Sequence, residues 1–156
     1  MTGGVYYLVI NLLQDLVIDV GGLGRITLNK GIYVYVGSGK GLGGIYRRIY
    51  RHFLRNKKSF WHIDYLTTNS QTQVIGAVAV INKTLNESFL SKLLMGDRCF
   101  KPAVKGFGCS DIRSDSTHLY MFICEHGVVN HLVRKLMDAG VPMNDVILID
   151  QNCLKS

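Results

Sequence analysis

Apolar residues in the N-terminal part of the chain form short runs separated by turn residues, a pattern typical of β-strands. The run GVYYLVI at residues 4–10 predicts one strand. Residues 16–20 and 25–28 predict two more, joined by a glycine-rich turn, and residues 32–36 predict a fourth after a second turn. We therefore expect an antiparallel meander of about four strands.

The pattern then changes, and apolar side chains recur every three or four positions. This spacing predicts a helix over residues 42–54 with one buried stripe. The stripe consists of Leu42, Ile45, Ile49 and Phe53. Basic residues occupy other faces: positions 47, 51 and 55 share one, and Arg48 and His52 form a separate i, i+4 pair.

The second half of the chain mixes strand and helix signals. Residues 74–81 are apolar throughout and predict a central strand. A helix should follow to about Leu94, with Asn86 as its N-cap, Glu87 in its first turn and Gly96 at its end. Residues 97–116 predict mostly irregular structure. The remaining predicted elements are a strand at 118–124, a helix at 128–139 and a short strand at 146–150. This order predicts an α+β fold.

Length and composition are typical of one globular domain. The chain has 156 residues, of which 47% are hydrophobic, and no low-complexity linker. Its four cysteines show no C-x-x-C pair and no zinc-like spacing, so we expect buried or idle thiols in a reducing cytoplasm. No basic leader precedes the first apolar run, and that run is too short to span a bilayer. The prediction is a cytoplasmic protein with no membrane association.

The charge distribution suggests a polyanionic partner. The net charge is +7, and nine of the 18 basic residues lie between Asp19 and Asp64 with no acidic residue among them. A solvated helix face beside a basic loop is the plainer interpretation, but the adjoining glycines and tyrosines favour nucleic acid, most simply DNA. The candidate contacts are Lys40, Arg47, Arg51, Arg55, Lys57 and Lys58.

The glycine-rich segment between the fourth strand and the first helix allows a different interpretation. Residues 39–44 satisfy G-x-G-x-x-G, and Asp64 follows 20 positions later, as in a dinucleotide-binding unit. The preceding strands, however, are predicted to form hairpins and not a βαβ unit. A small-molecule nucleotide-binding protein using the glycine loop 37–44 is therefore kept as one alternative. The other is a tight turn that lets a phosphate approach the helix.

An ordered set of short motifs resembles the GIY-YIG nuclease superfamily. These motifs are Gly4-Val5-Tyr6, Tyr35-Val36-Gly37, R-x-x-x-H from Arg48 to His52, and a later helix opening on Glu87. The chain looks closest to a small, largely uncharacterised branch with Y-V-G-S-x-x-G-x-G-G and W-H-I-D-Y-L. The nuclease-like motifs cover residues 4 to about 95, and a C-terminal α/β extension follows at about 97–150. The resemblance implies an antiparallel sheet with a hairpin insertion, flanked by helices.

A literal G-I-Y also occurs at residues 31–33, but it lies two positions from Tyr35. Side chains at 33 and 35 share one face of one strand, whereas the superfamily places its two triplets on different strands. Gly4-Val5-Tyr6 is therefore the better match, with Tyr33 as the fallback.

The resemblance implies a metal-dependent endonuclease. Tyr6, helped by Tyr35, would orient or deprotonate water, Arg48 would stabilise phosphoryl charge, and His52 would contact the substrate or the nucleophile. Glu87 would hold one Mg²⁺ or Mn²⁺. The plainer interpretations are cross-strand aromatic packing for the tyrosines, a surface position for Arg48 and a helix-dipole role for Glu87.

Other polar residues are candidates for supporting roles. His62 and Asp64 flank Ile63 in the W-H-I-D-Y-L motif, and a packed structural corner is the favoured interpretation over metal ligation. Asp111 and His118 are candidate polar supports. At the level of function, a nucleic-acid-binding module without catalysis remains the main alternative to the nuclease. The sequence leaves open DNA against RNA, the substrate's shape and the oligomeric state.

Overall fold

The computed structural model describes residues 3–40, 44–109 and 115–151. Within these residues, six strands form one antiparallel sheet, two more form a separate hairpin, and four α-helices accompany them. The strands are β1 (Val5–Leu12), β2 (Leu16–Asp19), β3 (Arg25–Leu28), β4 (Gly31–Ser38), β5 (Thr72–Val80), β6 (Phe100–Pro102), β7 (Leu119–Phe122) and β8 (Val146–Asp150). The helices are α1 (Gly44–Phe53), α2 (His62–Thr67), α3 (Glu87–Met95) and α4 (Val128–Asp138), with 3₁₀ turns at Gly21–Leu23 and Met143–Asp145. The predicted α+β class is confirmed.

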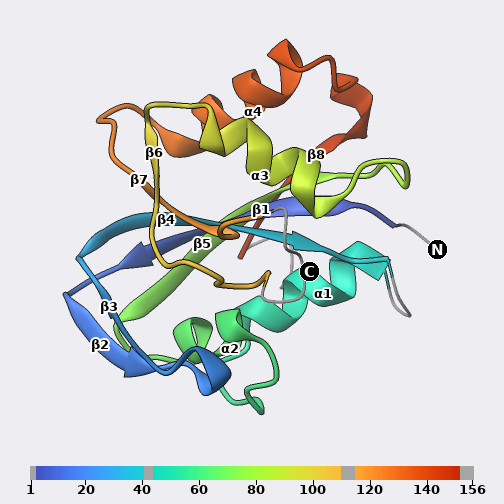
Figure 1. The fold of residues 1–156 in the computed structure, drawn as a ribbon. Coiled ribbons are helices and arrows are strands. Elements are labelled where there is room, and N and C mark those ends of the chain that lie inside the picture. Colours follow the sequence, from blue (N-terminus) through green and yellow to red (C-terminus); the bar gives the residue numbers. More distant parts are fainter. Residues whose placement is uncertain (1–2, 41–43, 110–114, 152–156) are drawn as a thin grey trace.

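The strand order of the main sheet is β6-β7-β4-β1-β5-β8 (Figure 1). β1 pairs directly with β4, with Tyr6 opposite Gly37, while β2 and β3 pair only with each other in the described part of the chain. The expected four-strand meander is therefore wrong, and the hairpin insertion is right. The pairing of β1 with β4 is non-local, because the whole hairpin is looped out between them. The local turn signals could not reveal it.

Helices cover both faces of the main sheet. Helices α1 and α2 lie on one face with the β2–β3 hairpin, and α3 and α4 lie on the other (Figure 1). Along β1, Tyr6, Leu8 and Ile10 enter the first core, while Tyr7 and Val9 enter the second. Because both faces of the sheet are buried, the sequence of β1 is an almost continuous apolar run, with no alternation between apolar and polar residues.

Most helix boundaries match their sequence signals. Ile45 and Ile49 of the predicted stripe are fully buried on α1, and Leu42 lies outside the described residues. At α3, the Asn86 side chain accepts the Phe89 N–H, which is the predicted N-cap. Two elements were not anticipated: α2, inside the W-H-I-D-Y-L motif, and the short strand β6, within a segment predicted to be irregular.

Two of the four cysteines form a disulfide between Cys99 and Cys124. This corrects the expectation of idle thiols. The bond joins the residue just before β6 to a loop residue after β7, and the 25-position gap between them concealed the pairing. Among the described residues, no helix has the length and apolar character needed to cross a membrane.

Candidate functional site

The predicted catalytic tyrosines lie on neighbouring strands and meet a helix residue. Tyr6 on β1 and Tyr35 on β4 both face the core that contains α1. The Tyr6 hydroxyl lies 2.6 Å from Nε2 of the buried His52, and the Tyr35 ring lies edge-on to the same imidazole at 6.0 Å between centroids. The sheet and α1 thus bring Tyr6, Tyr35 and His52 into one cluster, which we call the tyrosine cluster.

Glycines provide the space for these rings. A Cβ at Gly37, opposite Tyr6 in the sheet, would lie 2.4 Å from the Tyr6 Cζ. Gly108 has a φ of +75°, and a Cβ there would lie 2.9 Å from Cε1 of Tyr35. The glycines of the Y-V-G and G-F-G segments therefore admit the aromatic side chains of the tyrosine cluster.

Burial controls the protonation of this cluster. It raises the pKa of Tyr6 well above the ordinary value, and the neighbouring Tyr35 raises it further. Burial likewise raises the pKa of Tyr35, with Glu87 adding to the effect. For His52, burial and the Lys57 charge lower the pKa to about 3. Both phenols and the imidazole are therefore neutral at physiological pH.

Arg48 lies beside the cluster on α1. Its guanidinium carbon stacks 4.1 Å from the centroid of the Trp61 ring, a cation–π contact that fixes the side chain. The positive charge of Arg48 opposes the rise in the pKa of Tyr6 and of Tyr35, and it also lowers the pKa of Glu87. Arg48 is therefore in electrostatic contact with all three groups.

Glu87 is held at the start of α3 by partners from two other segments. Its Oε1 accepts the Ser38 hydroxyl at 2.6 Å, and its Oε2 lies 3.2 Å from Nδ1 of His118. The other imidazole nitrogen of His118 lies 2.7 Å from Asp115, which also accepts the Ser88 hydroxyl. A buried histidine thus bridges two carboxylates.

This bridge determines the charges of the site. Burial alone would lower the pKa of His118, but pairing with Glu87 and Asp115 outweighs it and raises the pKa. Burial would raise the pKa of Glu87, but the ion pair with His118, the hydrogen bond from Ser38 and the charge of Arg48 lower it. Both shifts favour an imidazolium beside an anionic Glu87.

Glu87 also has the chemistry of a hard-cation ligand. Its side chain is 26% exposed, and each carboxylate oxygen keeps a lone pair beyond its one protein partner. A hydrated Mg²⁺ or Mn²⁺ needs only one or two carboxylates and retains several waters. The residues present therefore fit the predicted metal, and His118 is a cation that would compete with it.

Two of the predicted nucleic-acid contacts, Arg51 and Lys57, are paired with Asp64 inside the protein. Asp64 is fully buried, and its Oδ2 accepts the backbone N–H groups of Phe60 and Trp61 as well as the Arg51 guanidinium at 2.9 Å. Lys57 lies 3.8 Å from Oδ1 of Asp64. The sequence shows no counter-charge for this basic block, but the fold supplies one from α2. Asp64 therefore has a structural role, in line with the packed corner that was the favoured interpretation of the W-H-I-D-Y-L motif.

The other four basic candidates do not pair with Asp64. Arg55 donates to the carbonyls of Asn69 and Thr72, which ties the end of α1 to the start of β5. Arg55 is itself exposed, as are Lys40, Arg47 and Lys58. A role in binding nucleic acid stays a prediction for all six residues, and these four are more exposed than Arg51 and Lys57.

Of the remaining predicted site residues, His62 and Tyr33 do not join the tyrosine cluster directly. His62 accepts the Gly108 N–H through Nδ1 at 2.8 Å, so it joins α2 to the segment that packs on Tyr35. Asp111 lies outside the described residues. The fallback Tyr33 donates to the Asn29 carbonyl at the opposite end of β4 from Ser38, away from His52.

Three contributors were missed by sequence reasoning. Ser38 is part of the quoted Y-V-G-S motif, and its hydroxyl was the available signal. Trp61 was interpreted as packing alone, although a tryptophan beside a basic helix is a natural partner for arginine. Asp115 was overlooked, although it lies only three positions before the candidate His118 and contacts its ring.

The comparisons with known proteins give one match. Residues 5–140 match the family described as "Domain of unknown function DUF123". The chain belongs to the DUF123 family. The matched span of this DUF123 protein contains the tyrosine cluster, Arg48, Glu87 and His118. Searches of curated proteins and of solved structures gave no match. The family assignment describes no activity, so function rests on the chemistry of the site.

Proposed function

We propose that this protein is an endonuclease-like phosphodiesterase that depends on a divalent metal and acts on nucleic acid, DNA being the first candidate. One observation carries the proposal: Tyr6, Tyr35, His52, Arg48 and Glu87 come from four elements and converge on one end of the sheet. The order of these residues in the GIY-YIG-like motifs agrees with this convergence. A neutral tyrosine–histidine pair, a fixed guanidinium and a carboxylate together suit phosphodiester hydrolysis.

Each residue has a defined part in the proposal. In the His52 tautomer with its proton on Nδ1, the Tyr6 hydroxyl donates a hydrogen bond to Nε2, and the phenol oxygen can then accept a hydrogen bond from the attacking water, with Tyr35 helping to orient it. Arg48, held against Trp61, stabilises negative charge on the phosphoryl oxygens. Glu87, held by Ser38 and His118, would bind the Mg²⁺ or Mn²⁺. The bound metal would supply charge neutralisation and water activation.

The test is a nicking assay on supercoiled and branched DNA with Mg²⁺ or Mn²⁺. We expect Arg48→Ala to reduce cleavage by about 10²-fold or more, because it removes a group that stabilises the transition state. Glu87→Gln should abolish the metal-dependent cleavage, because it removes the proposed metal ligand. The matched controls are Arg47→Ala, next to Arg48 but exposed, and Glu125→Gln, an exposed glutamate. Undiminished cleavage by Arg48→Ala and Glu87→Gln would show that the activity belongs to a contaminant.

A second candidate is a nucleic-acid-binding module without catalysis. The raised pKa values of Tyr6 and Tyr35 favour it, since neither phenol ionises readily, as does the positive charge of His118 already beside Glu87. This candidate predicts binding to DNA or RNA with no cleavage in either metal. Arg48→Ala would then weaken binding while the fold stays intact.

A small-molecule nucleotide site in the glycine loop has less support. All strand pairs in the described part of the chain are antiparallel, so no βαβ unit precedes α1. Asp64, the expected ribose ligand, is buried in its pair with Arg51. Thermal-shift measurements with NAD and ATP test this alternative, and we expect no shift.

A further inference from the structure

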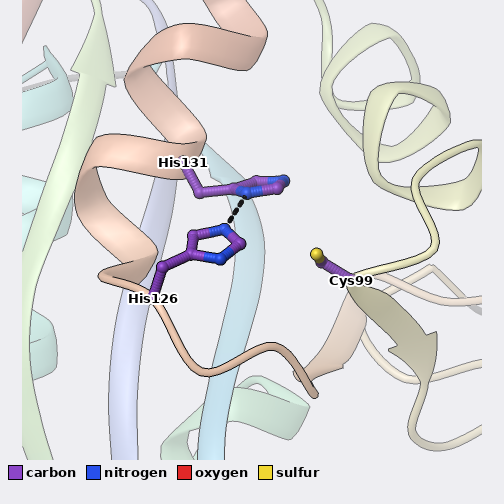
Figure 2. A group of neighbouring side chains, drawn as sticks. All are labelled: Cys99, His126 and His131. Carbon is purple, nitrogen blue, oxygen red and sulfur yellow. Dashed lines mark hydrogen bonds between the residues drawn. The ribbon is translucent and has the colours of Figure 1, made fainter.

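A second cluster of metal-binding side chains lies on the other face of the sheet from the tyrosine cluster. Cys99 precedes β6, His126 lies in the loop before α4, and His131 lies within α4. One donor atom from each lies within 4.8 Å of the other two. Figure 2 shows the two imidazole rings next to each other, joined by a hydrogen bond, with the Cys99 sulfur pointing toward them from the other segment. Nothing in the proposed phosphodiesterase uses this cluster.

The hydrogen bonds of His131 assign its tautomer. His131 places Nε2 2.6 Å from Oδ2 of Asp97, and a carboxylate can only accept, so Nε2 carries the proton. In the neutral imidazole, Nδ1 of His131 then carries the lone pair. In the metal-free structure this nitrogen accepts a hydrogen bond from Nε2 of His126 at 2.6 Å, and the two rings are stacked with 4.8 Å between their centroids (Figure 2). Two ring nitrogens from different segments thus lie next to each other, and a metal ion would replace the proton between them.

Asp97 positions two of the candidate ligands at once. Its Oδ1 accepts the Cys99 backbone N–H at 2.8 Å, while its Oδ2 holds His131 and lies 3.4 Å from Lys135. A carboxylate that accepts from the far nitrogen of a ligating histidine is a frequent feature of protein zinc sites, because it fixes both the tautomer and the ring orientation. The cluster therefore has the supporting contact that such a site requires.

The fourth donor is Cys124, whose sulfur is bonded to that of Cys99 in the structure. On reduction by a dithiol, the disulfide becomes two thiols and the dithiol becomes a disulfide. The two thiols then release their protons when they bind a metal. The resulting set is two thiolates and two imidazoles, the donors that Zn²⁺ prefers in four-coordinate structural sites. Tetrahedral Zn²⁺ separates its ligand atoms by about 3.3 to 3.8 Å. The donor atoms of Cys99, His126 and His131 already lie within 4.8 Å of one another, and on reduction the Cys124 sulfur would have to move away from that of Cys99.

We propose that Cys99, Cys124, His126 and His131 form a structural Zn²⁺ site in the reduced protein, with the Cys99–Cys124 disulfide as its oxidised, metal-free alternative. The site would join the sheet edge at β6 and β7 to the start of α4. Phe100 and Phe122 pack against the His131 ring and shield the site from one side.

The test uses the full chain, reduced with a dithiol and then freed of the small molecules under anaerobic conditions. We expect one Zn²⁺ per chain by elemental analysis. With Co²⁺ as the probe, we expect tetrahedral d–d bands and a thiolate-to-cobalt charge-transfer band. Oxidation to the disulfide should release the metal. A reduced protein that binds neither ion would overturn the proposal.

Variants locate the metal within the cluster. His126→Ala is the best substitution, because His126 is exposed and its loss leaves the core intact, and it should weaken or remove the cobalt bands. Asp97→Asn should lower the affinity by about 10- to 100-fold. Cys109→Ser, which changes the buried cysteine outside the cluster, should leave stoichiometry and spectrum unchanged. Unchanged spectra in His126→Ala and Asp97→Asn would place the metal elsewhere and refute the site. None of these readouts depends on phosphodiester cleavage.

Discussion

At the scale of single residues, carboxylates paired with cations organise the charges of this protein. Asp64 pairs with both Arg51 and Lys57, and Glu87 and Asp115 share His118. Asp64 lies on α2 while its two partners precede that helix, and Glu87 lies on a different segment from His118. The basic character seen along the sequence is therefore partly cancelled in the fold.

Asp64→Asn should destabilise the protein by about 3 kcal/mol, because it leaves the half-buried Arg51 and the buried Lys57 without their anion. Urea denaturation measures the change. The matched control is Asp19→Asn, whose pair with Arg25 is more than 70% exposed on both sides and contributes less than about 1 kcal/mol. Equal losses in the two variants would refute the role given to Asp64.

The same carboxylate makes a prediction about pH. Burial alone would raise the pKa of Asp64, but hydrogen bonds from the Trp61 and Phe60 N–H groups and from Arg51 lower it below the unfolded value. Its contribution to stability is therefore present above the unfolded pKa of about 3.9 and lost as the pH falls through the folded pKa. The stability difference between wild type and Asp64→Asn should shrink below about pH 4. A difference that stays constant down to pH 2 would contradict this.

His118 provides a second titration. Its pairing with Glu87 and Asp115 overcomes burial and raises its folded pKa, so its contribution to stability is full below the unfolded pKa of about 6.5 and is lost as the pH rises through the folded pKa. Glu87→Gln should lower the pKa of His118, as measured by the NMR shifts of its ring protons. His62, whose pKa burial lowers, serves as the internal control and should not move. A His118 titration unchanged by Glu87→Gln would show that the bridge does not control it.

At the scale of elements, the pairing of β1 with β4 builds the tyrosine cluster. Gly37→Ala should place a Cβ against the Tyr6 ring and destabilise the protein by about 1–3 kcal/mol, while displacing Tyr6 from His52. Thermal unfolding and the NMR shifts of His52 measure the two effects. Gly22→Ala, where a Cβ meets nothing within 4 Å, is the matched control. An unchanged unfolding temperature and unchanged His52 shifts in Gly37→Ala would show that the sheet accommodates the added Cβ and that Gly37 is not needed to place Tyr6 against His52.

Sequence signals predicted those elements that carry their own local markers. Asn86 and Gly96 bounded α3 because a helix end needs its caps nearby, and the spacing of Ile45 and Ile49 defined the buried face of α1. β6 was missed because three residues ending in Pro102 leave no periodic pattern. The Cys99–Cys124 pair was missed because its members lie on separate segments. The order of the motifs identified Tyr6, Tyr35, Arg48 and Glu87, whereas the pairing of Glu87 with His118 could be placed only by the fold.

At the scale of the whole molecule, only some of the basic side chains are available to a polyanion. Arg51 and Lys57 pair with Asp64, and the exposed Arg55 is held by two backbone carbonyls, so the exposed Lys40, Arg47 and Lys58 should carry most of the salt-dependent part of nucleic-acid binding. Arg47→Ala should therefore reduce the slope of log K against log salt on duplex DNA by about 0.9, the release of one phosphate's counterions. Fluorescence anisotropy at several salt concentrations measures the slope. Arg134→Ala removes an exposed arginine on α4, across the sheet, and should leave it unchanged. Equal reductions in both variants would mean that DNA responds to net charge alone and that the α1 face is not the binding surface.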